Sequence, residues 1–201
     1  MNDDKIMLPE IIVFAGPNGS GKSTITKLAK VIEPYINADD IKRAYCCTDM
    51  EAAIKAESLR EESVALHRGF TFETVLSTDR NLNLLCRAKK SGFFIRCIYV
   101  LTANPAVNVS RIKSRVANGG HDVPREKIFS RYKKALTLLP ELVKVCDIMH
   151  IYDNTNMPAR IFKKRKDEYF FWENDFWNRQ QIEKLTGIVF KTFRHEGDEA
   201  L

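Results

Sequence analysis

A glycine-rich segment near the amino terminus, GPNGSGKST at residues 16–24, constrains this chain more than any other feature. It fits the pattern G-x-x-x-x-G-K-[ST], in which glycines let successive backbone N–H groups point at one anion. The apolar residues 11–15 before it predict a strand buried in a parallel sheet, and residues 22–31 after it predict a helix. The segment therefore predicts a P-loop that binds a nucleoside triphosphate. Its expected members are Gly16, Pro17, Asn18, Gly19, Ser20, Gly21, Lys22, Ser23 and Thr24.

Two side chains of this P-loop have expected roles of their own. Lys22 is expected to reach the outer phosphates, and the Ser23 hydroxyl is expected to ligate Mg²⁺. The alternative is a glycine-rich turn between a strand and a helix that binds no ligand. The coincidence of strand, glycines, Lys-Ser pair and helix argues against that alternative.

Strands and helices alternate along the chain, which predicts a parallel sheet with helices on both faces. We expect a P-loop NTPase fold of the nucleoside-kinase type, a three-layer α/β sandwich with a five-stranded parallel sheet and a helical lid. The expected strands are 10–15, 34–37, 70–75, 94–101 and 146–152, and the expected helices are 22–31, 50–68, 79–90, 105–118 and 125–144. Ligands on such sheets bind at the carboxyl ends of the strands.

The length of 201 residues fits a single domain, 1–201, with the lid at about 111–131 and an aromatic appendage at about 158–190. The aromatic residues of the appendage either pack against the domain or form a partner surface. The net charge of +6 favours anionic partners such as nucleotides, phosphorylated sugars or nucleic acid, although plain solubility explains it equally well. Residues 163–166, KKRK, hold much of this excess and are interpreted as a solvated surface run.

The cysteine pattern and the apolar runs favour a cytoplasmic protein. The five cysteines are an odd number without a C-x-x-C motif, which indicates a reduced chain without a disulfide framework or zinc site. The acidic start, residues 1–5, is no secretory signal. The longest apolar stretch, 93–101, is interrupted by Arg96 and is too short to span a membrane.

Two carboxylates stand near the predicted strand ends. Asp39 follows a short strand, where it fits either a helix N-cap or the base that takes a proton from an acceptor hydroxyl. The adjacent P-loop favours the base. Glu73 lies within a predicted buried strand, where it fits either an ion pair with an arginine or a substrate contact. Asn37 and Thr74 lie at the same strand ends as these carboxylates.

Several arginines surround a glycine pair in residues 111–131. Arg111 and Arg115 share one helix face, the pair at 119–120 breaks the helix, and Arg131 follows on the next helix. This arrangement fits a lid that clamps phosphates, or equally an exposed basic helix pair. No strand ends in an Asp-Glu pair and no L-S-G-G-Q-like stretch occurs, which disfavours a transporter-type ATPase.

Taken together, these segments resemble the zeta toxin family of P-loop kinases. The matching pieces are GPNGSGKST at 16–24, INAD at 36–39, FETVLS at 72–77, RVANGGHDVP at 115–124 and the Arg131-Tyr132 pair. They occur in family order over roughly residues 8–155. The resemblance implies an ATP- and Mg²⁺-dependent kinase, of which the best-known family substrate is UDP-N-acetylglucosamine, phosphorylated on a sugar hydroxyl. It also implies an antitoxin partner.

The resemblance carries roles over to individual positions. Lys22 and Ser23 hold phosphates and Mg²⁺, and Asp39 is the base. The substrate contacts are Asn37, Asp39, Glu73 and Thr74, and the lid arginines on the transferring phosphate are Arg115 and Arg131. Two other classes stay open: a nucleic-acid end kinase or repair-type ATPase, and a nucleotide-binding regulator without turnover. A small-molecule acceptor is preferred to nucleic acid, because the basic run has no clear stacking platform beside the cleft.

Overall fold

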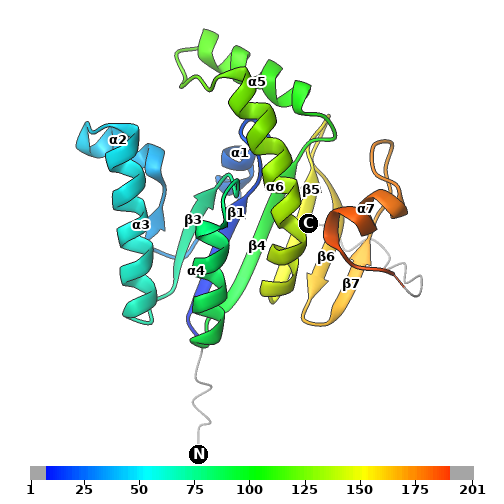
Figure 1. Ribbon diagram of the computed structural model, residues 1–201, viewed down its shortest axis with the longest axis horizontal. Helices are drawn as coiled ribbons and strands as arrows, with labels where there is room; N and C mark the ends of the chain where they lie inside the picture. The colour runs from blue at the N-terminus through cyan, green and yellow to red at the C-terminus, as the bar shows by residue number, and fades with distance from the viewer. Residues whose placement is uncertain (1–7, 191–201) are drawn as a thin grey trace, which may run out of the picture.

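The computed structural model describes residues 8–190, which form one twisted sheet flanked by helices (Figure 1). The start at residues 1–5, on which the expectation about a secretory signal rested, lies outside the described residues. The strands are β1 (Glu10–Ala15), β2 (Tyr35–Ile36), β3 (Phe70–Thr74), β4 (Phe94–Leu101), β5 (Ile148–Asp153), β6 (Ala159–Arg165) and β7 (Glu168–Phe171). The helices are α1 (Lys22–Thr26), α2 (Ala38–Tyr45), α3 (Asp49–Ala65), α4 (Asp79–Lys90), α5 (Pro105–Ala117), α6 (Arg125–Val145) and α7 (Arg179–Thr186).

The sheet has the strand order β2-β3-β1-β4-β5-β6-β7. The first five of these strands are parallel, as the alternation of strands and helices predicts. The α/β fold class is thus confirmed, but the expected count of five strands is wrong. β6 and β7 add an antiparallel hairpin to the edge formed by β5.

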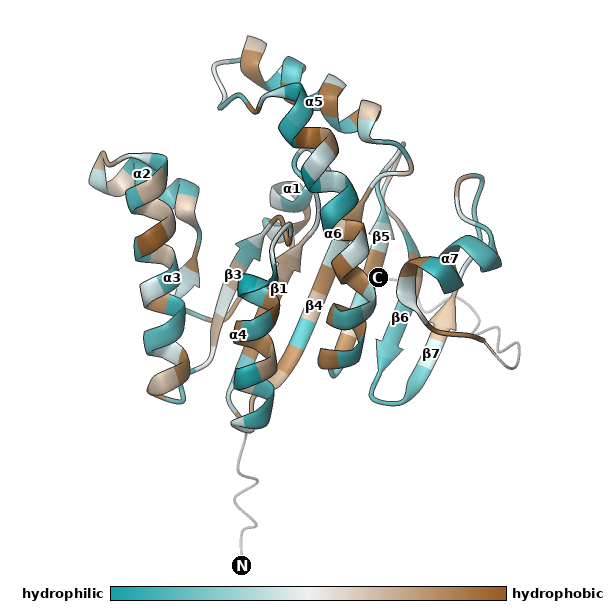
Figure 2. Cartoon of the chain, viewed as in Figure 1, coloured by the Kyte–Doolittle hydropathy of each residue, from teal (hydrophilic) through white to brown (hydrophobic). Residues whose placement is uncertain are grey.

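The hairpin was missed because its first strand is rich in lysine and arginine and is coloured as hydrophilic in Figure 2. The interpretation of residues 163–166 as a solvated run is therefore wrong for Lys164, whereas Arg165 and Lys166 are exposed as expected. Lys164 is buried, and its ammonium donates to the carbonyls of Val143 at 2.7 Å and Lys144 at 3.2 Å, at the end of α6. Those carbonyls have no partner inside the helix, so Lys164 caps it.

The main hydrophobic core lies between one face of the sheet and the helices α4, α6 and α7 that cover this face (Figure 1). Alternate residues of β1, such as Val13, enter this core, whereas Phe14 points to the opposite face of the sheet, where α1 lies. α1 is shorter than the predicted helix 22–31, because the chain after Thr26 tightens into turns. No described helix is both long and apolar enough to cross a bilayer.

Two elements at the carboxyl edge of the sheet complete the frame of the site. α2, which the expected helix ranges omit although Asp39 was considered as a helix N-cap, directly follows β2 and packs against α3. The lid consists of α5, the loop 118–124 and the first turns of α6, and it has a small cluster of its own formed by Val109, Ile112, Val123 and Ile128. The P-loop, α2 and the lid therefore all lie at the carboxyl ends of the parallel strands (Figure 1).

Candidate active site

The P-loop joins the carboxyl end of β1 to α1 and is wedged between neighbouring strands. The Gly16 N–H donates to the Thr74 carbonyl of β3 at 3.2 Å, which ties the loop to the sheet. Gly16 has φ 138°, and a Cβ there would lie 2.0 Å from the Val100 carbonyl oxygen. Gly19 has φ 77°, and its Cβ would lie 2.7 Å from the Asn108 carbonyl oxygen. Only glycine fits these two positions, so the backbone can curl with its N–H groups inward.

The lysine of the P-loop folds back over the loop itself. Its ammonium donates to the Gly16 carbonyl at 2.7 Å and to the Pro17 carbonyl at 3.0 Å. Burial lowers the pKa of Lys22 to about 8, although the negative charges of Glu73 and Asp39 raise it; Arg115 lowers it further. Lys22 thus lies at the mouth of the loop, where phosphates would meet it.

A second polar group of the P-loop also fits an anion. The Ser20 hydroxyl is fully buried and has no hydrogen-bond partner among the described residues. Buried hydroxyls normally have partners, so this group fits a loop that closes around phosphate oxygens. The backbone shape of the loop and this unpaired donor therefore both fit a bound triphosphate.

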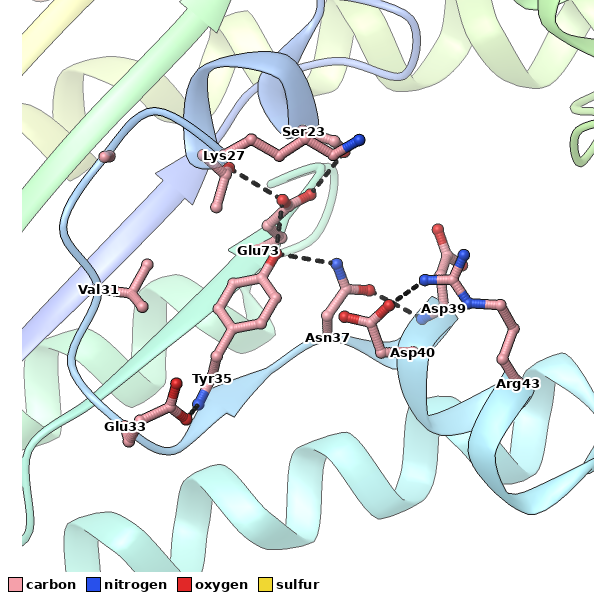
Figure 3. A pocket seen from close by; sticks show the side chains of 12 residues that line it. Ser23, Lys27, Val31, Glu33, Tyr35, Asn37, Asp39, Asp40, Arg43 and Glu73 are labelled. Carbon is pink, nitrogen blue, oxygen red and sulfur yellow. Dashed lines mark hydrogen bonds and ion pairs between the residues drawn. The ribbon is translucent and has the colours of Figure 1, made fainter.

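A cavity of about 490 Å³ opens beside the P-loop, between α1, β2 and α2 (Figure 3). Its lining is acidic and rich in hydroxyl and amide groups: Ser23, Thr26, Lys27, Ala29, Val31, Glu33, Tyr35, Asn37, Asp39, Asp40, Arg43 and Glu73. The sequence-predicted residues Ser23, Asn37, Asp39 and Glu73 thus meet in one cavity.

Asn37, and not Asp39, caps the helix that follows β2. The Asn37 side-chain oxygen accepts from the Asp39 N–H at 2.8 Å, and its amide donates to the Tyr35 hydroxyl at 3.1 Å. Asp39 is exposed at the cavity, and its carboxylate has no hydrogen bond or ion pair among the described residues. Asp40 beside it is paired with Arg43. Of the two neighbouring carboxylates, Asp39 is thus the one that is free to accept a hydrogen bond or a proton.

Glu73 points from β3 to the face that carries α1 and accepts three hydrogen bonds (Figure 3). One carboxylate oxygen accepts from the Tyr35 hydroxyl at 2.7 Å and from the Thr26 hydroxyl at 2.9 Å. The other accepts from the Ser23 hydroxyl of the P-loop at 3.3 Å. The expected alternative, an ion pair with an arginine, does not occur among residues 8–190. Burial raises the pKa of Tyr35 well above its ordinary value, so this hydroxyl stays a donor.

Thr74 does not join this cavity. As the next residue in β3 it points to the other face of the sheet, and it is buried. Its hydroxyl oxygen accepts from the Leu76 N–H at 3.0 Å and from the Asn81 amide at 2.8 Å. In this arrangement Thr74 holds the chain after β3.

The arginines of the lid differ in what they reach. Arg131 donates to the Asn18 side chain of the P-loop at 3.4 Å. Arg115 instead donates to the His121 carbonyl of the lid loop at 2.5 Å. Arg111 donates to the Thr155 carbonyl at 3.1 Å and, more weakly, to the Ser20 carbonyl at 3.5 Å. The structure thus brings Arg111 and Arg131 to the P-loop and turns Arg115 to the lid.

Two asparagines that support the P-loop were not identified as site residues from the sequence. The Asn108 amide donates to the Asn18 carbonyl at 2.7 Å, and its oxygen accepts from Thr102. The Asn154 amide donates to the Ser20 carbonyl at 2.8 Å. Asn154 follows the last parallel strand, a position at which the topology rule for parallel sheets places ligand contacts, whereas nothing in the local sequence marks Asn108.

The described residues contain no group of three or more histidine, cysteine or acidic side chains arranged to hold a metal. This is compatible with Mg²⁺, which keeps several waters and is bound through one or two protein oxygens together with substrate phosphates. Ser23 and Glu73, whose side chains meet at the start of α1, are the oxygen donors best placed for it.

The chain is similar to a protein from Haemophilus influenzae named "Uncharacterized protein". The two are 30% identical over 133 residues, which covers 63% of this chain and 95% of that protein. This chain belongs to the same family as that protein. No protein-family model matches the chain.

Solved structures with the same fold come from complexes. A chain of the AvrRxo1-ORF1:AvrRxo1-ORF2 complex with ATP gives a TM-score of 0.69 at 11% identity, over 96% of this chain and 68% of that one. The PezAT toxin-antitoxin system of Streptococcus pneumoniae gives 0.52 at 16% identity, over 92% and 86%. A chain of the Pnkp1/Rnl/Hen1 RNA repair complex gives 0.53 at 16% identity, over 67% and 46%, so this chain spans less than half of it. At these identities the likeness shows the fold, which agrees with the zeta-toxin-like and P-loop kinase-like fold expected from the sequence.

Proposed function

We propose that this chain is an ATP-dependent kinase that transfers the γ-phosphate to a hydroxyl group of a small molecule. One observation carries the proposal: the Asp39 carboxylate is unpaired and faces a cavity that also contains Ser23 of the P-loop. A phosphate donor site and a free base beside one polar cavity are the two parts that phosphoryl transfer to an alcohol requires.

The residues of the chain divide the work as follows. The P-loop backbone and Lys22 hold the triphosphate, and Ser23 would hold Mg²⁺, which when bound offsets phosphate charge. Asp39 accepts the proton of the acceptor hydroxyl while the oxygen of that hydroxyl forms a bond to the γ-phosphorus. The bond from that phosphorus to the bridging oxygen breaks, and ADP leaves. Arg131, and Arg115 after a movement of the lid, would stabilise charge on the transferring group.

For the acceptor we propose a nucleotide-sugar such as UDP-N-acetylglucosamine, on the strength of the resemblance to zeta toxins. The polar lining of the cavity supports a sugar, since Asn37 and Asp39 carry groups that bind hydroxyls. Lys27 and Arg43 are the cations on this lining that could meet a diphosphate. Thr74, on the opposite face of β3, stays a predicted contact only for an acceptor that reaches beyond this cavity.

A second candidate function is phosphorylation of a nucleic-acid end, favoured by the fold shared with a chain of an RNA repair complex. The third is a nucleotide-binding regulator without turnover, which gains no specific support from the site. We also propose that the chain acts as the toxin of a pair and binds a small antitoxin. The similar folds in PezAT and in the AvrRxo1-ORF1:AvrRxo1-ORF2 complex support this partner.

One experiment separates these functions. The purified chain is incubated with ATP and Mg²⁺ and a panel of acceptors: nucleotide-sugars, free sugars and a 5′-hydroxyl oligonucleotide. Mass spectrometry then reads each acceptor for an added phosphate. A phosphorylated nucleotide-sugar that fails to form with the Asp39→Asn variant supports the first proposal. Phosphate on the oligonucleotide alone supports the second, and ATP binding without any product supports the third.

A further inference from the structure

Glu73 is a half-buried carboxylate whose direct partners are all neutral. Its hydrogen-bond donors are the hydroxyls of Tyr35, Thr26 and Ser23, and no lysine, arginine or histidine of the described residues forms an ion pair with it. Lys22 responds to its charge, but the Lys22 ammonium is bound to two P-loop carbonyls. A carboxylate withdrawn from water without a counter-charge is costly. The site therefore lacks a cation beside Glu73.

We propose that Glu73 belongs, together with Ser23, to the divalent-cation site of the nucleotide complex, and that it is not an acceptor contact as the sequence predicted. This inference rests on the proposed function, because the cation arrives with the nucleotide. The geometry favours the cation over the acceptor: Glu73 bonds directly to the P-loop serine, and both side chains start from elements fixed to β1. Carboxylate and hydroxyl oxygens are the donors that Mg²⁺ and Mn²⁺ prefer.

The two oxygens of Glu73 are prepared differently. Tyr35 and Thr26 both donate to the same oxygen, at 2.7 and 2.9 Å, and so fix the orientation of the carboxylate. The other oxygen has only the 3.3 Å bond from Ser23, which is long for O–H···O. This second oxygen is the one available for the cation or for a water bound to it. Tyr35 is thus a positioning residue, and its bond from Asn37 links the cation site to the start of α2.

The test uses Mn²⁺ and ADP with the full chain, so that no turnover is needed. The electron paramagnetic resonance signal of free Mn²⁺ gives the affinity of Mn²⁺ for the protein–ADP complex. For Glu73→Gln we expect roughly 10- to 100-fold weaker Mn²⁺ binding, the range typical for partners that orient metal ligands. The affinity for ADP without metal should stay within about twofold, which also shows that the variant is folded. Tyr35→Phe should weaken Mn²⁺ binding in the same direction by a smaller factor.

Asp40→Asn is the matched control, because it removes a carboxylate from the same cavity that is paired with Arg43. Its Mn²⁺ affinity should equal that of the unmodified chain, which excludes a general effect of cavity charge. Glu73→Gln with unchanged Mn²⁺ affinity and a raised KM for the acceptor overturns the inference and restores the acceptor contact. An unmodified chain that binds Mn²⁺ and ADP but phosphorylates no acceptor contradicts the proposed function alone.

Discussion

The Asn37 side chain caps α2 by accepting the backbone N–H of Asp39 at 2.8 Å, which leaves the Asp39 carboxylate without a structural task. We therefore predict that Asp39→Asn retains ATP binding but loses transfer by roughly 10²- to 10⁴-fold, the usual contribution of a general base. Binding by calorimetry and transfer by mass spectrometry would separate the two. Glu57→Gln is a control expected to be silent, because this carboxylate of α3 pairs with Arg80 of α4 and does not line the cavity. Transfer by Asp39→Asn at a near-normal rate contradicts the role of the base.

From the lowered pKa of Lys22 we predict that this side chain takes up a proton when a nucleotide binds at alkaline pH. Its pKa of about 8 in the free protein leaves the amine mostly neutral at about pH 9, while the phosphates favour the ammonium form. We expect binding at this pH to take up most of one proton and the affinity to fall as pH rises above about 8. Calorimetry in two buffers of different ionisation enthalpy measures the uptake. At about pH 7 Lys22 is already protonated, so its contribution to the proton uptake should vanish. Proton uptake that persists at this pH would come from another group.

Two arginines near the start of α6 give a matched pair. Arg131 reaches Asn18 of the P-loop, whereas Arg125 lies over the Phe129 ring, 5.6 Å from its centroid, at the exposed start of α6. We predict that Arg131→Gln lowers kcat by about 10²-fold or more, because charge stabilisation of the transferring group is lost. Arg125→Gln should leave kcat within about twofold. Equal losses in both variants would indicate a general electrostatic effect of the lid.

From the lowered pKa of His150 we predict that the protein loses stability in acid. Burial, assisted by Arg160, Lys163 and Arg96, lowers the pKa of this side chain from 6.5 to about 4. The unfolded chain binds the proton first as pH falls, so the free energy of unfolding decreases between about pH 6.5 and 4, by roughly 1 kcal/mol per pH unit. Urea unfolding at several pH values measures this slope. His150→Gln should flatten it, and an unaltered slope would assign the acid sensitivity to other groups.

Local signals in the sequence were sufficient for the elements that frame the P-loop. β1, β4 and α4 have the predicted boundaries, because a buried apolar run or an amphipathic pattern ends there at polar residues. The P-loop position followed from its glycines for a similar reason. Each of these features depends on residues that are neighbours along the chain.

Features that depend on strand order could not be read from the sequence. Tyr35 reaches Glu73 only because β2 lies beside β3, which places side chains that are 38 residues apart within 2.7 Å. Lys164 is buried because the end of α6 needs a donor, and no local pattern distinguishes it from its solvated neighbours. Asn108 supports the P-loop from 90 residues away. The contact of Glu73 with Ser23, on which the proposed cation site rests, depends on the pairing of β3 with β1.

α6 belongs to two hydrophobic clusters at once, with Ile128 in the small cluster of the lid and Leu139 and Leu142 in the main core. Between them the Tyr132 hydroxyl donates to the Thr102 carbonyl, just beyond β4, at 2.5 Å. A single rod of 21 residues thus has its base anchored in the fold and its tip held by only a few apolar contacts. The tip can open at a much lower free-energy cost than the base. α6 thus combines a base that is fixed in the main core with a tip, close to the P-loop, that we expect to open more readily.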